Sequence, residues 1–238
     1  MHAIRTLSVA IMFILFTPVL LAAKSTCTPL VLSDIHVAEE TAGFMVDVRY
    51  PVLCVEKASR TIRDWVGYRL FDFKKFDPDH DLSDFPHKYD MTMNYSVWSV
   101  ASGRLASVKL DVDVYTGGAH PNHWPMTWVF DMANGDTVTL EELISNMETT
   151  LPAISVICRA VLVNTLDSGI RDMILDGTEP LEENFSRFIL NDEGVTFIFP
   201  HYQVAPYSFG EQVVTIPYAN ITKHLTPEIN QALGLTIP

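Results

Sequence analysis

The sequence lacks the short motifs by which many enzymes are recognised. Its 238 residues contain no Gly-x-Ser-x-Gly nucleophile elbow, no phosphate-binding glycine loop and no His-Glu-x-x-His zinc helix. It also has no internal repeat and no low-complexity segment. These absences leave no local signature of a serine hydrolase, a P-loop protein or a zinc protease, so any site must be assembled from distant positions.

Basic residues are scarce. The chain has 16 Lys and Arg residues against 29 Asp and Glu residues, which gives a formal net charge of −13 at pH 7. An acidic surface repels nucleic acid and anionic lipid, and it attracts basic proteins as well as keeping a protein soluble. We therefore expect no nucleic-acid partner, and a basic protein is the kind of macromolecular partner that the charge favours.

Long apolar runs are lacking except at the N-terminus. Arg5 precedes an apolar run over residues 7–21 that ends in Ala22 and Ala23, which is the order found in secretory signal peptides. Because a spanning helix needs ~20 apolar residues, a signal peptide over residues 1–23 is favoured over an uncleaved anchor. We expect an exported protein, periplasmic or secreted, with no transmembrane helix after cleavage.

Cysteine is rare, with three residues in the chain. A hairpin turn centred near Glu40 and Thr41 would place Cys27 opposite Cys54, and export would favour their oxidation. The sequence therefore predicts a Cys27–Cys54 disulfide. Cys158 lies in a helix-like run and is expected to be a buried free thiol, with a bridge between two chains as the lesser alternative.

The periodicity of apolar residues predicts an α+β fold with a mainly antiparallel sheet and a few packed helices. The acidic, proline-containing stretch at residues 77–87 is the candidate boundary between two intimately associated subdomains, a hairpin-helix unit at residues 24–86 and a unit at residues 87–238. Thr139 and Glu142 predict a capping box. The expected strands span residues 30–37, 44–52, 91–101, 105–115, 123–131, 185–190, 195–199 and 213–217, and the expected helices span residues 56–76, 140–144 and 150–166, with a helical turn at 218–225.

Glycine and proline gather in one connection, Tyr-Thr-Gly-Gly-Ala-His-Pro-Asn-His at residues 115–123, which we call the Gly-Pro turn. Two imidazoles three residues apart, His120 and His123, could bind zinc together with Asp111, Asp113 or His201. In a strand-like segment, however, the two rings would point to opposite faces. We therefore expect no metal, and alternation alone predicts that the two aspartates lie on a solvated outer face.

A second unusual segment combines tyrosine and proline. It reads Phe-Pro-His-Tyr-Gln-Val-Ala-Pro-Tyr-Ser-Phe-Gly at residues 199–210, and we call it the Tyr-Pro loop. Tyrosine side chains held by prolines make stiff, amphipathic contact points of the kind found at protein interfaces. The alternative is a loop that folds over the core with its rings buried.

These two segments resemble a known bacterial family. The words at residues 115–122 and 197–210 are similar to those of the extracellular domain of RsiV-type anti-sigma factors, which also accompanies the deacetylase domain of PdaC-like peptidoglycan deacetylases. The similarity covers roughly residues 91–218. It implies a domain without established catalysis of its own, and in the RsiV-type sensors the domain binds lysozyme, a basic enzyme. This sequence shows neither a sigma-binding segment nor a deacetylase domain.

The favoured hypothesis is an exported, non-enzymatic binding protein of the bacterial envelope that recognises lysozyme, another cell-wall hydrolase or peptidoglycan. The alternatives are a cell-wall glycan hydrolase or deacetylase that uses His120 and His123, and a purely structural envelope domain. No catalytic residue and no cofactor are predicted. The candidate binding residues are Tyr115, Gly117, Gly118, His120, Pro121, Asn122, Pro200, Tyr202, Pro206 and Tyr207.

Overall fold

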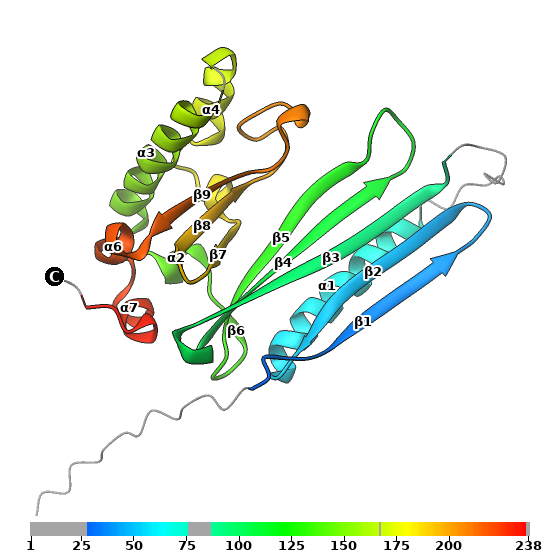
Figure 1. Cartoon of the computed structure of the whole chain (residues 1–238), viewed down its shortest axis with the longest axis horizontal. Helices are drawn as coiled ribbons and strands as arrows, with labels where there is room; N and C mark the ends of the chain where they lie inside the picture. Colours follow the sequence, from blue (N-terminus) through cyan, green and yellow to red (C-terminus); the bar gives the residue numbers. More distant parts are fainter. Residues whose placement is uncertain (1–27, 76–86, 167, 237–238) are drawn as a thin grey trace, which may run out of the picture.

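The computed structural model describes residues 28–75, 87–166 and 168–236. Within these ranges the fold is α+β, with a six-stranded sheet in the order β1-β2-β3-β4-β5-β6 and a three-stranded sheet in the order β7-β8-β9 (Figure 1). The predicted fold class is confirmed. The predicted signal peptide, residues 1–23, lies outside the described residues.

The large sheet is antiparallel at every pairing but one. A hairpin of β1 (Val31–Glu40) and β2 (Phe44–Leu53) leads into helix α1 (Glu56–Lys74). The chain then returns in β3 (Tyr89–Val100), which pairs with β2 in parallel, as a helical crossover requires. The remaining strands form an antiparallel meander: β4 (Leu105–Tyr115), β5 (Asn122–Asp131) and the short β6 (Asp136–Thr137).

The turn of the first hairpin lies further along the chain than the sequence predicted. Glu40 pairs with Met45, so the turn is centred between Ala42 and Gly43. The Thr41 hydroxyl accepts the backbone N–H of Phe44 at 3.0 Å, a local bond that fixes this later turn. The register argument for the cysteine pair is therefore wrong. The Cys27–Cys54 disulfide itself involves a residue outside the described ranges and stays a prediction.

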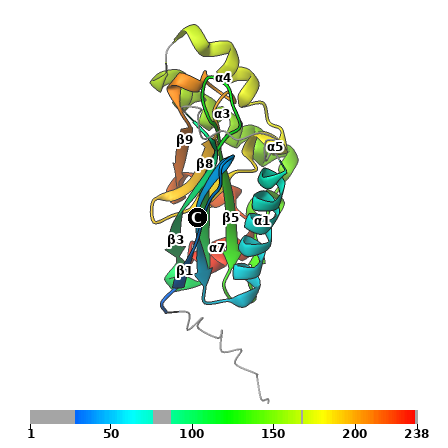
Figure 2. The same ribbon diagram turned by 90° about the vertical axis from the view of Figure 1, so that its right-hand side faces the viewer.

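Helix α1 covers one face of the large sheet, as Figures 1 and 2 show. Its apolar residues recur at helical spacing, and the facing strands contribute alternate side chains, so both periodicities point into one cluster. Each fully buried aliphatic or aromatic side chain contributes roughly 1.5–3 kcal/mol. The opposite face of strands β2 to β5 is left for polar residues. The cluster includes Val48, Ala58, Ile62, Val66, Met93, Val108, Leu110, Val112 and Phe130.

The second cluster lies between the small sheet and the helices that follow β6. The predicted capping box is present, because the Thr139 hydroxyl and the Glu142 carboxylate each accept the other residue's backbone N–H.

Residues 185–187, predicted as strand, are not strand, since Phe185 ends a short helix and is buried. The elements are α2 (Leu140–Leu143), α3 (Met147–Thr165), α4 (Arg171–Gly177), α5 (Glu182–Phe185), β7 (Phe188–Leu190), β8 (Gly194–Phe199), β9 (Gln212–Pro217), α6 (Tyr218–Ile221) and α7 (Pro227–Leu233).

The large sheet takes part in both clusters. Leu105 and Val129, on β4 and β5, belong to the second cluster, while their neighbours on the same strands belong to the first. Ser107, which is fully buried, donates to the carbonyl of Leu190 at 2.9 Å and accepts its N–H at 2.8 Å. These two hydrogen bonds fix β7 against β4, at one end of the polar face of the large sheet. The expected boundary at residues 86 and 87 falls between α1 and β3, whereas the two clusters meet along β3 to β5.

Helix α3 meets the length and composition of a membrane-spanning helix, as core helices also do. One of its faces is buried against the second cluster through Ile154, Cys158 and Leu162. Cys158 is a free, buried thiol, as predicted, and burial raises its pKa to about 12. A thiol so far from its ionised form is a packing residue at neutral pH.

Candidate functional site

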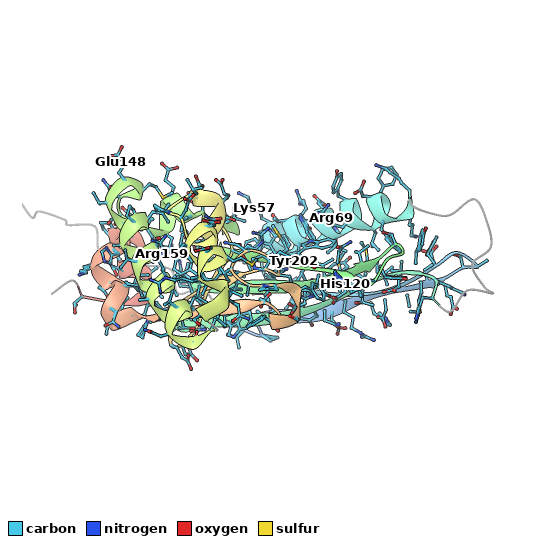
Figure 3. The ribbon with its side chains drawn as sticks, turned by 90° about the horizontal axis from the view of Figure 1, so that it is seen from above. Lys57, Arg69, His120, Glu148, Arg159 and Tyr202 are labelled. Carbon is cyan, nitrogen blue, oxygen red and sulfur yellow. The ribbon has the colours of Figure 1, made fainter. Side chains whose placement is uncertain are left out.

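The Gly-Pro turn and the Tyr-Pro loop lie side by side, although some 80 residues separate them in the chain. The first connects β4 to β5 and the second connects β8 to β9 (Figure 1). Figure 3 shows His120 and Tyr202 next to each other near the middle of the molecule. The imidazole of His120 stacks on the ring of Tyr207 with centroids 3.9 Å apart. We call His120, Pro121, Tyr202 and Tyr207 the His120 cluster.

Hydrogen bonds fix the orientation of each ring in the His120 cluster. The Nδ1 of His120 lies 2.8 Å from the carbonyl oxygen of Pro121, which can only accept, so Nδ1 carries the proton. Nε2 then accepts the phenol hydroxyl of Tyr202 at 3.2 Å. The hydroxyl of Tyr207 donates to the same Pro121 carbonyl at 3.1 Å. All four residues are therefore linked as one unit, with the imidazole of His120 at its centre.

Backbone conformation explains why these segments carry their glycines. Gly117 and Gly118 have φ angles of +93° and +119°, which L side chains rarely adopt, and a Cβ at Gly118 would meet open space. The glycine is needed for its backbone angle and not for a close approach. The Tyr115 hydroxyl closes the turn by donating to the carbonyl of Gly118 at 3.2 Å.

Tyr202 also has a left-handed backbone, with φ at +67°, which is uncommon for an aromatic residue. Its neighbour Gln203 holds the strained position, because the Gln203 amide donates to the carbonyls of Gly177 at 2.9 Å and Asn184 at 3.0 Å. Tyr202 is 58% exposed, whereas Val204 and Ala205, which follow it in the loop, are buried. Strain that presents an apolar ring to solvent is typical of functional positions.

A cluster of charged side chains adjoins the His120 cluster on the polar face of the large sheet. His123 lies opposite Asp113 in the β4–β5 pairing, and its Nδ1 donates to the Asp113 carboxylate at 2.9 Å. The ammonium of Lys109 lies 2.7 Å from both Asp111 Oδ1 and Glu211 Oε1. We call Lys109, Asp111, Asp113, His123, His201 and Glu211 the His123 cluster.

Burial strengthens the electrostatic interactions among the charges of the His123 cluster. The side chains of Lys109 and Glu211 are 15% and 16% exposed. Desolvation acts against the charged form of Lys109, but the hydrogen bonds to Asp111 and Glu211 raise its pKa above the ordinary value. Burial, followed by the proximity of His123, lowers the pKa of His201. The cluster thus combines a fixed ammonium and carboxylates with two imidazoles, of which His201 has a lowered pKa.

A continuous row of rings joins the two clusters. The centroid of His201 lies 4.9 Å from that of His123 and 4.5 Å from that of Tyr207, which in turn stacks on His120. The two histidines of the Gly-Pro turn therefore sit at opposite ends of one row, in different chemical surroundings. They do not converge on one metal position.

Six of the ten predicted binding residues take part in the contacts described above, in two groups. His120, Pro121, Tyr202 and Tyr207 are brought into direct contact, and Tyr115 and Gly118 close the adjacent turn. Sequence reasoning missed Lys109 and Glu211, which organise the charged cluster. Their only sequence signals are a lysine on the polar side of a strand and a glutamate directly after the Tyr-Pro loop. Neither signal indicates that Lys109 on β4 forms an ion pair with Glu211, which is 102 residues further along the chain.

The chain is similar to known proteins in sequence and in fold. Residues 141–219 match the family described as "Protein of unknown function (DUF3298)". The chain is 27% identical over 174 residues to the peptidoglycan-N-acetylmuramic acid deacetylase PdaC of Bacillus subtilis, covering 73% of this chain and 37% of PdaC. It is 23% identical over 186 residues to the esterase Rv3036c of Mycobacterium tuberculosis, covering 78% of this chain and 80% of the esterase. This chain therefore spans well under half the length of PdaC.

Two solved structures share the fold. A DUF3298-family protein of Bacteroides fragilis superposes with a TM-score of 0.61 at 17% identity, over 85% of this chain and 96% of that one. A DUF3298-family protein of Pseudomonas aeruginosa superposes with a TM-score of 0.58 at 16% identity, over 83% of this chain and 95% of that one. At such low identity these similarities concern the fold alone.

Proposed function

From the DUF3298 domain that this chain carries, which is homologous to part of PdaC as the two sequence words indicated, we propose that the chain is an exported envelope protein. Its ligand is a basic cell-wall hydrolase such as lysozyme. The observation that carries the proposal is the meeting of the Gly-Pro turn with the Tyr-Pro loop. Together they present Tyr202, stacked rings and exposed backbone on one side of the molecule.

Charge supports a basic partner for this surface. On the polar sheet face next to the His120 cluster, carboxylates outnumber permanent cations, and the whole chain carries −13. Complementary charge accelerates encounter and favours the correct partner, while a few central aromatic side chains supply most of the affinity. The carboxylates are Asp34, Asp47, Asp90, Asp111, Asp113 and Glu211, and the permanent cations are Arg49, Lys109 and Arg187, which donates to the Pro125 carbonyl.

The test is a titration of the purified chain, without residues 1–23, against lysozyme at low and moderate salt. Tyr202→Ala and Tyr207→Ala are each expected to weaken binding by about 1–3 kcal/mol because they remove interface anchors. Tyr68→Ala is the matched control, since Tyr68 is equally exposed, at 60%, but lies on α1 behind the sheet. Absence of binding at low salt would remove lysozyme as the partner, and equal loss in all three variants would move the contact surface elsewhere.

Peptidoglycan is the second candidate ligand, because the matched relative PdaC is named for action on it. Stacked rings with hydroxyl groups at their rims are also suited to sugar rings. Co-sedimentation with purified cell-wall sacculi distinguishes this candidate. Binding to sacculi that is lost in Tyr207→Ala, without binding to lysozyme, would favour the glycan.

An enzymatic alternative is motivated by the relative named as an esterase. Among the described residues, neither His120 nor His123 is hydrogen-bonded to a serine, threonine or cysteine side chain. A nucleophile of the acyl-enzyme type is therefore not assembled there. Hydrolysis of a chromogenic ester by the purified chain, abolished by His123→Ala, would overturn the non-enzymatic proposal.

A further inference from the structure

We propose that the His123 cluster is a binding site for one divalent transition-metal ion of the Zn²⁺ type. The ligands are His123 Nε2, Asp111 Oδ1 and Glu211 Oε2, with His201 beside them. This site is distinct from the docking surface formed by the His120 cluster, and it does not depend on the identity of any macromolecular partner.

The three donor atoms already surround one point. His123 Nε2 lies 3.9 Å from Asp111 Oδ1 and 4.0 Å from Glu211 Oε2, and all three atoms lie within 4.8 Å of one another. Bonds of about 2.1 Å in tetrahedral geometry would place the donors roughly 3.4 Å apart. Completing the site therefore requires contractions of about 0.5 and 0.6 Å along the two edges that meet at His123 and of at most about 1.4 Å along the Asp111–Glu211 edge, which small rotations of the two carboxylate side chains would supply.

The ring of His123 is oriented as a metal ligand. Its Nδ1 donates to Asp113 Oδ1 at 2.9 Å, so Nδ1 carries a proton and Nε2 is the nitrogen that faces the two other donors. Metal-binding histidines usually hold their second nitrogen by such a carboxylate, which sets the tautomer and the ring direction. Because Asp113 does this from the neighbouring strand, the ligand is held in place before any ion arrives.

Two buried polar atoms at this site are left without partners. Glu211 Oε2 and His201 Nδ1 are both buried and form no hydrogen bond with any described residue. Buried side-chain atoms of this kind are normally satisfied, so each unpartnered atom calls for an explanation. A cation between Asp111, His123 and Glu211 supplies the missing partner of Glu211, and the ring of His201 flanks that position.

Lys109 leaves the site open to an ion. Its ammonium binds Glu211 through Oε1, the other carboxylate oxygen, and it shares Asp111 Oδ1, which has a second lone pair. Asp111, Asp113 and Glu211 together carry three negative charges against the single charge of Lys109. A divalent ion would neutralise the remainder, which removes an electrostatic cost in a half-buried location.

The donor set also indicates the class of ion. One imidazole with carboxylates suits Zn²⁺ and its neighbours, whereas Ca²⁺ and Mg²⁺ favour sites made of oxygen atoms alone. Three protein ligands leave a coordination position for water or for a group from a bound partner.

The test is equilibrium dialysis of the untagged, chelator-treated chain against Zn²⁺, with metal measured by mass spectrometry. We expect about one ion per chain, and His123→Ala should lower the affinity by on the order of 100-fold or more. His120→Ala is the matched control, because that ring is three residues away and belongs to the other cluster. Its affinity should remain within about threefold of the parent chain.

Conservative variants keep the test decisive if His123→Ala unfolds the protein. Glu211→Gln preserves size and removes a ligand charge, and Asp113→Asn should weaken Zn²⁺ binding by about 10–100-fold through loss of ring orientation. The visible absorption of added Co²⁺ reports a four-coordinate site independently of any activity. Absence of Zn²⁺ binding, or binding unchanged by Glu211→Gln in a folded variant, would overturn the proposal.

Discussion

His120 and His123 are three residues apart, yet they lie in contrasting surroundings. His120 is on the turn, stacked on Tyr207 and hydrogen-bonded to the phenol of Tyr202 and to a carbonyl. His123 is inside strand β5 and faces the carboxylates of β4 across the pairing. The difference shows that the boundary between a turn and a strand, and not the spacing of the residues, decides their chemistry. One cluster is partly exposed and aromatic, and the other is a half-buried set of charges.

The largest expected effect comes from removing the cation of the charged cluster. Lys109→Met would leave Asp111 and Glu211 without their shared ammonium, and we expect a loss of about 3 kcal/mol in the free energy of unfolding. Chemical denaturation measures it. Lys57→Met, which breaks a pair with Asp136 at a 61% exposed lysine, should cost less than about 1 kcal/mol. Equal losses would mean that burial does not distinguish the charged cluster from the surface.

Local patterns predicted much of the fold. The capping box at Thr139 and the antiparallel meander of β3 to β5 follow from short-range periodicity and turn residues, and the structure contains both. The parallel pairing of β2 with β3 and the approach of Glu211 to Lys109 depend on packing across the chain, which no local pattern records. At residues 185–187, alternation predicted a strand, but burial of Phe185 in the hydrophobic core around the small sheet favours a helical turn.

The next effect would separate the two clusters by displacing the Tyr-Pro loop. A Cβ at Gly177 would lie 2.0 Å from the carbonyl oxygen of Gln203, so Gly177→Ala must push that loop away. We expect a loss of about 2 kcal/mol in stability, measured by denaturation, together with weaker binding of any partner of Tyr202. Gly118→Ala provides the contrast, because the added Cβ meets open space and only backbone strain remains. Intact stability in Gly177→Ala would show that the loop is not held at this point.

A smaller effect concerns the hydrogen bond within the exposed cluster. Tyr202→Phe removes the hydroxyl that donates to His120 Nε2 at 3.2 Å while keeping the ring. We expect a loss of about 1 kcal/mol or less in stability, since the bond is exposed to solvent. The imidazole resonances of His120 should shift in the NMR spectrum while those of His123 stay in place. Shifts of equal size at both histidines would show that the row of rings behaves as a single cluster.

The smallest expected effect is the pH dependence of stability due to His224, which lies outside both the His120 cluster and the His123 cluster. Burial, and then the charge of Lys223, lower the pKa of His224 from its model-peptide value of 6.5. The unfolded chain therefore takes up this proton more readily, so the stability that His224 contributes above pH 6.5 is lost as the pH falls below that value. Thermal unfolding between pH 7.5 and 5 should show a shallower decline in His224→Gln than in the parent chain. An unchanged decline would place the proton uptake at other groups.

The central claim is that two distant segments act as one docking surface, and hydrogen–deuterium exchange in the presence of lysozyme tests it most directly. We expect backbone amides of residues 115–123 and residues 200–210 to gain protection together on binding, while those of α1 do not change. Protection confined to one segment, or appearing on α1 instead, would contradict the claim.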